Sequence, residues 1–226
     1  MTSIYQKVLG SDFNRLHPRI QERFGFSSAD HVACIGRGTM HEIWHGRFYT
    51  LPFLYVGSWR RIMFPERGAN IPFSIENYAF QDPFGRETVT WMRQFKTRRN
   101  RRFDAYMIYS EQRGCIVDYL GTHQHLAVDI DLSVDEKGGL KLRSGAQRFY
   151  EGWIGFSFPL IFSGIADVNE WFDEKIQKFA SKSASVTAHG GRCSDIEVRS
   201  RRNGCEMSRL FQMDFSRFVS NGANNP

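Results

Sequence analysis

The feature that most constrains the fold is a strict two-residue alternation of apolar and polar or small side chains in residues 126–134. The apolar positions are Leu126, Val128, Ile130, Leu132 and Val134. Alternate side chains of an extended chain point to opposite faces, so this segment predicts a strand with one buried and one hydrated face. Similar runs begin at residue 71. The whole stretch 71–134 therefore predicts a meander of antiparallel strands.

Turn residues separate these runs. Asp82-Pro83-Phe84-Gly85 predicts a reversal of the chain, because Pro fixes φ and Gly accepts positive φ. A meander must curl or close to protect its edges. We therefore expect a mainly β (α+β) domain: an antiparallel β-barrel or strongly curved meander sheet, lipocalin-like or helix-grip-like, with N-terminal helices.

Helical spacing marks the N-terminal segment 3–24, where apolar residues recur every three or four positions. Gly10 and Pro18 interrupt this stripe, which predicts two short helices, with Ser11-Asp12 capping the second. The first strand is expected within residues 34–49.

A second helical stripe predicts a helix between Pro52 and Phe64, with Val56 and Trp59 among the residues on its apolar face. Residues 165–179 fit both a helix and a strand hairpin, and the neighbouring meander favours the hairpin. We expect a single β-rich domain over 1–180. Residues 181–226, rich in Ser and Arg, are expected to form a poorly ordered tail.

Composition limits the class of protein. Aromatic residues make up 15% of the chain, which suits packing between curved sheets or a lined cavity. No apolar run approaches the roughly 20 residues of a membrane helix, and no leader is recognisable. We therefore expect a cytoplasmic protein without a transmembrane segment, in which all four cysteines are free thiols.

The positive charge is concentrated in one place. The net charge is +6, and the basic residues between Arg93 and Arg102 have no acidic residue among them. This patch could contact phosphates of nucleic acid or of a membrane surface, or simply be a solvated loop. The sequence argues against nucleic acid, because no aromatic residue interleaves the basic residues from Lys96 to Arg102.

Several short motifs resemble those of a known protein family, and none of them is a catalytic signature. They are Leu16-His17-Pro18, Phe64-Pro65-Glu66, Trp91-Met92-Arg93-Gln94-Phe95, Asp118-Tyr119-Leu120-Gly121 and the glycines at 138 and 139. On these motifs, the block from Ile4 to about Phe179 resembles a bacterial family of unknown function. Its members are sometimes fused behind a saccharopine-dehydrogenase-like Rossmann domain. The resemblance implies one β-rich domain and a Rossmann-type oxidoreductase as a candidate partner, but no activity.

One motif has the pattern of a zinc site. His41-Glu42-Ile43-Trp44-His45 matches H-E-x-x-H, in which a helix places two imidazoles one turn apart and the Glu acts as a general base. Glu66 would be the third ligand, giving a metal-dependent hydrolase. Glycines flank the motif, however, and in a strand the two imidazoles would lie too far apart to share one ion.

Arg93 is the other candidate functional residue. If Trp91 and Phe95 face the core, Arg93 does too, and an unpaired buried charge costs several kcal/mol. It either forms an internal ion pair, with Asp118 or Glu170 as partner, or holds an anionic ligand.

The function that these features favour is binding of a small hydrophobic or amphipathic anionic ligand in a barrel cavity. The expected ligand-binding residues are Trp91, Arg93, Phe95 and Asp118. No cofactor is expected, because the sequence has no nucleophile elbow, phosphate loop or dinucleotide fingerprint. The alternatives are the zinc hydrolase and a partner-binding accessory domain of an oxidoreductase.

Overall fold

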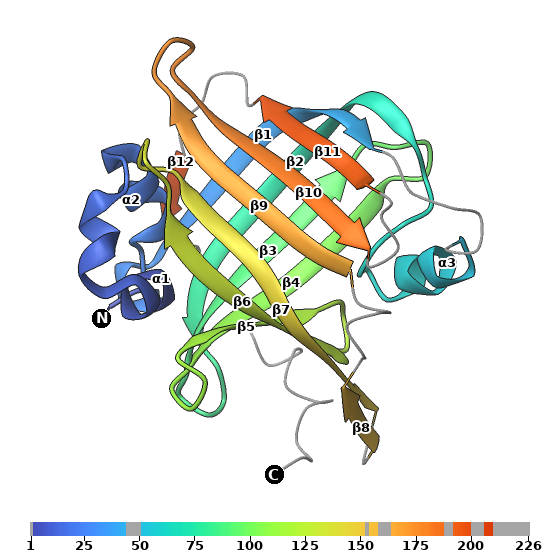
Figure 1. The fold of residues 1–226 in the computed structure, drawn as a ribbon, viewed down its shortest axis with the longest axis horizontal. Helices are drawn as coiled ribbons and strands as arrows, with labels where there is room; N and C mark the ends of the chain where they lie inside the picture. The colour runs from blue at the N-terminus through green and yellow to red at the C-terminus, as the bar shows by residue number, and fades with distance from the viewer. Residues whose placement is uncertain are drawn as a thin grey trace.

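The fold is built on one antiparallel sheet, which the computed structural model resolves as 12 strands among the described residues (Figure 1). The structure describes residues 2–43, 51–151, 154–157, 164–187, 192–199 and 206–209. The strands are β1 (Val32–Ile43), β2 (Gly68–Gln81), β3 (Glu87–Phe95), β4 (Arg101–Ser110), β5 (Cys115–Leu120), β6 (Leu126–Val134), β7 (Leu140–Glu151), β8 (Ile154–Ser157), β9 (Gly164–Asp173), β10 (Lys178–Thr187), β11 (Arg192–Arg199) and β12 (Glu206–Arg209).

The sheet curls until its last strands meet its first. Each strand from β1 to β7 pairs with the next, and β9, β10 and β11 continue the series while β8 pairs with β7 alone. β11 also pairs with β1, at Thr39↔Arg199 and Met40↔Val198, and β12 pairs with another part of β1. A curled antiparallel meander with N-terminal helices is therefore confirmed.

The two-residue alternation sets the faces of the strands as expected. Strand β6 spans Leu126–Val134, with Val128 and Ile130 buried and Asp131 exposed. The predicted turn after Asp82 is present, and Gly85 has a φ of 74°. A hairpin centred on residue 83, as the turn sequence predicts, would place Arg93 opposite Phe73, but the loop is centred further along the chain. Arg93 lies opposite Ile75 rather than Phe73.

The N-terminal segment covers one end of the barrel (Figure 1). It consists of α1 (Ile4–Leu9), the 3-10 helix η1 (Gly10–Arg15), α2 (Pro18–Phe24) and a second 3-10 helix η2 (Ser28–Asp30). The predicted pair of short helices is thus confirmed, but the cap was misplaced. Ser11-Asp12 lies inside η1, and His17 caps α2 by accepting from the Arg19 N–H.

This segment is fixed to the turn between β6 and β7. The His17 N–H donates to the Gly138 carbonyl at 2.9 Å. Gly138 has a φ of 76°, and a Cβ there would lie 2.7 Å from the His17 nitrogen, so only glycine fits. The His17 ring stacks on Phe172 and contacts the Glu174 carboxylate at 2.8 Å. Two sequence motifs, Leu16-His17-Pro18 and the glycine pair, therefore meet at one docking point.

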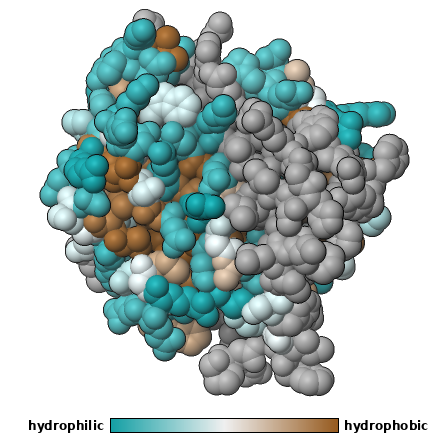
Figure 2. Space-filling view, in the orientation of Figure 1, coloured by the Kyte–Doolittle hydropathy of each residue, from teal (hydrophilic) through white to brown (hydrophobic). Residues whose placement is uncertain are grey.

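The largest core cluster joins these helices to the inner face of the sheet. Ile4, Ile20, Ile116 and Leu140 are fully buried within it. Figure 2 shows hydrophobic surface gathered in this view beside the N-terminal helical segment, bordered by hydrophilic residues. A smaller apolar cluster of Met40, Ile71 and Phe95 is separate from the first.

The helix expected between Pro52 and Phe64 is present as α3 (Leu51–Trp59), at the opposite end of the barrel from α1 and α2 (Figure 1). Its stripe does not face the core as predicted, since Val56 and Trp59 are 62% and 77% exposed. No helix among the described residues is long and apolar enough to cross a membrane.

The remaining expectations concern the second half of the chain. Residues 165–179 form the β9–β10 hairpin, as predicted. The domain boundary expected at 180 falls inside β10, and the described parts of 181–226 include β11 and β12. Most of the expected tail lies outside the described residues. Of the cysteines, Cys34 is disulfide-bonded and Cys115 is a buried free thiol, so the expectation of four free thiols is wrong.

Candidate functional site

The candidate site is a layer of charged side chains on the inner face of the barrel. On β3, the alternating positions Val89, Trp91, Arg93 and Phe95 share this face. Trp91 belongs to the large core cluster and Phe95 to the smaller one. Arg93 therefore sits where the two apolar clusters meet.

The Arg93 guanidinium is held between two aromatic rings. Its central carbon lies 4.7 Å from the Trp91 ring centroid and 4.6 Å from that of Phe103, which is opposite it on β4. Cation–π contacts of this kind stabilise a charge that is removed from water. No carboxylate of the described residues lies within 4.0 Å of it, so the internal ion pair predicted as one alternative is not formed there. The side chain is half-buried and keeps some accessible surface.

Asp118 also points inward, from β5. Its neighbours across the sheet are Met107 and Val128, both members of the large core cluster. The residue is 7% exposed, and its Oδ1 has no hydrogen-bond partner among the described residues. Burial raises the pKa of the Asp118 carboxyl from its ordinary 3.8 to about 7, although the positive charge of Arg93 acts in the opposite direction. Burial likewise lowers the pKa of Arg93, while the charges of Asp118 and Glu170 act to raise it.

A second pair of opposite charges completes the layer. Arg23 Nε, on α2, lies 3.1 Å from Glu170 Oε2, on β9, and both side chains are buried. The contact is an ion pair without the geometry of a hydrogen bond, since the Arg23 Nε–H has no acceptor. The Arg23 guanidinium also lies 5.3 Å from the Phe179 ring centroid.

Tyr5 links the helices to this layer. The Trp91 indole N–H donates to the Tyr5 hydroxyl at 2.9 Å, and that hydroxyl contacts the sulfur of Met107 at 3.5 Å. Burial raises the pKa of the Tyr5 phenol well above its ordinary range. Tyr5 therefore stays protonated and fixes the orientation of the Trp91 ring on which Arg93 stacks.

The side chains of this layer can bind a charged group in an apolar environment. Glu170 is matched by Arg23, whereas Arg93 and Asp118 have no direct ion-pair partner among the described side chains. A guanidinium can bind a carboxylate or phosphate through two parallel N–H donors. A carboxyl that titrates near neutrality can either donate or accept a hydrogen bond.

Of the four residues expected to bind a ligand, Trp91, Arg93 and Phe95 lie on one face of β3, and Asp118 lies on β5. The expected metal ligands do not form a site. His41 and Glu42 lie exposed near the end of strand β1, not on a helix, and His45 is outside the described residues. Glu66 pairs with Arg101 at 2.6 Å. Within the described ranges, no group of three or more His, Cys, Asp or Glu is placed to hold a metal ion.

Sequence reasoning missed Arg23 and Tyr5. Tyr5 belongs to the apolar stripe of residues 3–24, which predicts packing but no hydrogen bond for it. The spacing contained a usable signal for Arg23, because it follows the buried Ile20 by three residues and so shares a helix face with it. Nothing in the sequence indicates that this face meets Glu170, which is far away along the chain.

Comparison with known proteins places the chain in a family. A family model described as "Domain of unknown function (DUF4166)" matches residues 16–191. The chain belongs to this family. The uncharacterized protein YndH of Bacillus subtilis (strain 168) is 33% identical over 176 residues, which cover 77% of this chain and 84% of YndH.

The DUF4166 match confirms the expected likeness to a bacterial domain of unknown function. The matched range begins at Leu16, next to the His17 docking point, and includes Arg93, Asp118 and Glu170. It leaves out Tyr5. The fusion to a Rossmann domain stays a prediction.

Proposed function

We propose that this DUF4166 domain binds a small amphipathic anion inside the barrel, with the anionic group on Arg93 and the apolar part against neighbouring aromatic rings. The observation that carries the proposal is the half-buried Arg93 guanidinium, which is stacked between Trp91 and Phe103 and has no carboxylate within ion-pair distance among the described residues. A charge without a direct ion-pair partner in such a place costs several kcal/mol, and an anionic ligand would offset that cost.

The apolar part of the ligand would contact the smaller cluster. Phe95 and Met40 are buried there, while Phe73 and Phe103 are half-buried and line the same inner face next to Arg93. An acyl or aromatic group placed against these rings would gain about 25 cal/mol per Å² of apolar surface removed from water. The charged head alone would gain little over its hydration in water, so the proposal requires both parts.

Asp118 would make this binding sensitive to pH. With Asp118 ionised, the layer of Arg23, Arg93, Asp118 and Glu170 has no net charge; with Asp118 protonated, it carries one positive charge. Because the pKa of Asp118 is about 7, a bound anion favours uptake of a proton. Affinity should therefore rise as the pH falls from 8 to 6.

The test uses dodecanoate as the anionic probe and dodecanol as its neutral counterpart, with calorimetry on the purified protein. Arg93→Met keeps an unbranched apolar stem and removes the charge. We expect it to weaken dodecanoate binding about tenfold to a hundredfold while leaving dodecanol binding unchanged. Arg143→Met, at an exposed position on β7, is the control. Equal dodecanoate affinity of wild type and Arg93→Met, or no binding at all, would contradict the proposal.

Two further ideas from the sequence stay proposals. An accessory role beside a Rossmann-type oxidoreductase is supported only by the family resemblance, and pull-down with such a partner would test it. A cytoplasmic location is equally open to test by fractionation. The disulfide at Cys34 is of a kind that is rare in that compartment.

A further inference from the structure

Helix α3 presents an apolar surface to water at the end of the barrel opposite α1 and α2. Its sequence contains no charged residue, and a helix that is apolar all round is normally buried. Here Tyr55, Val56 and Trp59 are 59%, 62% and 77% exposed, and Met63 just beyond the helix is 39% exposed. We call these four residues the α3 patch. Most of the large exposed apolar side chains among the described residues belong to it.

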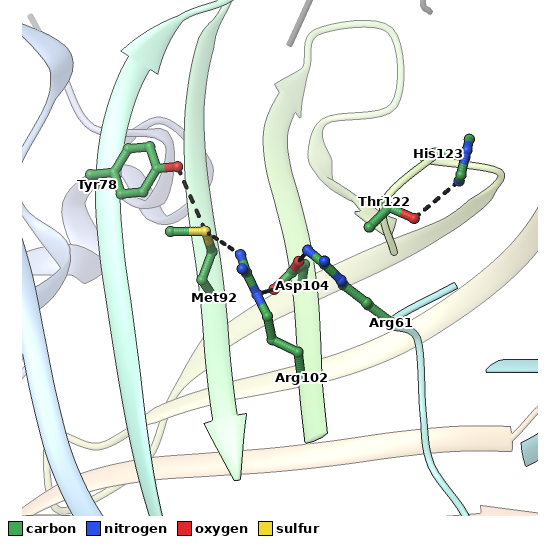
Figure 3. A network of polar contacts seen from close by, with 7 residues as sticks. All are labelled: Arg61, Tyr78, Met92, Arg102, Asp104, Thr122 and His123. Atoms are coloured by element: carbon green, nitrogen blue, oxygen red, sulfur yellow. Dashed lines mark hydrogen bonds and ion pairs between the residues drawn. The ribbon is translucent and has the colours of Figure 1, made fainter. Parts of the chain in front are cut away.

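The segment that follows helix α3 is fixed to the barrel wall, as Figure 3 shows for Arg61. The Arg61 guanidinium contacts the buried Asp104 at 3.4 Å, and the Arg61 carbonyl accepts from the Asp104 N–H at 3.1 Å. The Arg60 carbonyl accepts from the Thr122 N–H at 3.0 Å. A Cβ on Gly121 would lie 2.5 Å from that carbonyl, so glycine permits the close approach. The end of the helix is therefore held against the wall and does not project freely.

A basic hairpin lies next to this segment. Lys96, Arg98 and Arg99, in the turn between β3 and β4, are exposed and form no ion pair with any described residue. The chain from 94 to 103 contains no carboxylate. Arg101, where β4 begins, is joined to Glu66 at 2.6 Å, which ties this hairpin to the chain that leaves α3. Apolar and cationic surfaces therefore adjoin at one end of the barrel.

We propose that this end of the domain docks on an anionic membrane surface, with the α3 patch in the interfacial region and the basic hairpin on lipid headgroups. Trp and Tyr favour the interface between headgroups and acyl chains, because each combines an apolar ring with a polar tip. Exposed Lys and Arg beside them are attracted to anionic lipids. The absence of carboxylates from 94–103 favours a uniformly negative surface over a protein partner of mixed charge. This proposal stands independently of ligand binding in the barrel.

The test is co-sedimentation of the full chain with vesicles of phosphatidylcholine alone or of phosphatidylcholine and phosphatidylserine in equal parts. Wild type should bind the anionic vesicles, bind the neutral ones weakly, and dissociate as salt is added. Val56→Ser combined with Trp59→Ser should reduce the partition coefficient about tenfold. Arg98→Gln combined with Arg99→Gln should reduce it several-fold and flatten its dependence on salt.

Phe84→Ser is the matched control. Phe84 is 70% exposed in the turn between β2 and β3 and has Arg86 5.0 Å from its ring centroid, much as Trp59 has Arg60 at 4.9 Å. Its loss should leave vesicle binding unchanged. The proposal is overturned if wild type ignores anionic vesicles, if Phe84→Ser reduces binding as much as the α3 variants do, or if the α3 variants instead convert a dimer to a monomer without changing vesicle binding.

Discussion

Replacement of Asp118 by Asn should remove much of the pH dependence of stability in the neutral range. The pKa of this carboxyl is 3.8 ordinarily and about 7 in the folded protein. Each pKa unit corresponds to about 1.4 kcal/mol, so the whole shift represents about 4 kcal/mol. The residue is 7% exposed, so solvent screening reduces this figure little.

The sign follows from which state holds the proton. Between the two pKa values, the folded protein keeps a proton on Asp118 that the unfolded chain has released. Stability therefore falls as the pH rises through this window, and the full cost is present above pH 7. Between pH 5 and pH 8, wild type should lose about 2–3 kcal/mol more than Asp118→Asn.

The assay is urea denaturation of both proteins at pH 5 and pH 8 and constant ionic strength. Any constant effect of the amide, including its altered interaction with Arg93, cancels in the difference between the two pH values. Asp131→Asn, at an exposed position on β6, is the control and should parallel wild type. Parallel behaviour of wild type and Asp118→Asn would show that Asp118 is not a desolvated carboxyl, and the charged layer would need another description.

Three other predictions concern separate parts of the domain. Gly138→Ala should lower the free energy of unfolding by about 2 kcal/mol or more, because the added Cβ would meet the His17 backbone at a positive φ. Gly85→Ala, which has a similar φ but open space around it, should cost about 1 kcal/mol. Chemical denaturation compares the two variants, and equal losses would refute the docking contact. Trp91→Phe should lower the free energy of unfolding by about 1–3 kcal/mol, because the hydrogen bond to Tyr5 is lost. Thermal unfolding measures this loss, and an unchanged melting temperature would show that the hydrogen bond contributes nothing to stability. The hydrogen bonds of Arg148 lower the pKa of Asp129 in the folded state, so the stability that they add is lost as the pH falls. Arg148→Met should therefore destabilise the domain less at pH 3 than at pH 7, and denaturation curves that show the same loss at both pH values would contradict this.

The strands could be predicted because their signal is local. A period of two defines both the existence of a strand and its buried face, as in Leu126–Val134, and one face of β3 carries Trp91, Arg93 and Phe95 as that rule requires. The pairing register depends on the turn as well. The β2–β3 pairing was therefore wrong by two residues, an error that keeps every side chain on its face.

The candidate site was predictable in part for the same reason. Alternation alone placed Arg93 on an apolar face, and this singled it out. Its surroundings depend on distant segments, since Phe103, Asp118 and Glu170 come from other strands and Arg23 from a helix. Helix α3 shows the converse case. The apolar stripe of α3 predicted correctly that a helix forms but wrongly that its apolar residues are buried. Periodicity shows that residues share a face of the helix, but it does not show what lies opposite that face.

The contact between β1 and the strands at the other end of the sequence has a consequence for biosynthesis. β1 is synthesised long before β11 and β12, so the edge that it offers to them has no partner until those strands have been made. Pairing across such a span is slow, and an open edge invites pairing with other chains. The newly made domain therefore depends on its latest strands for protection of its earliest one.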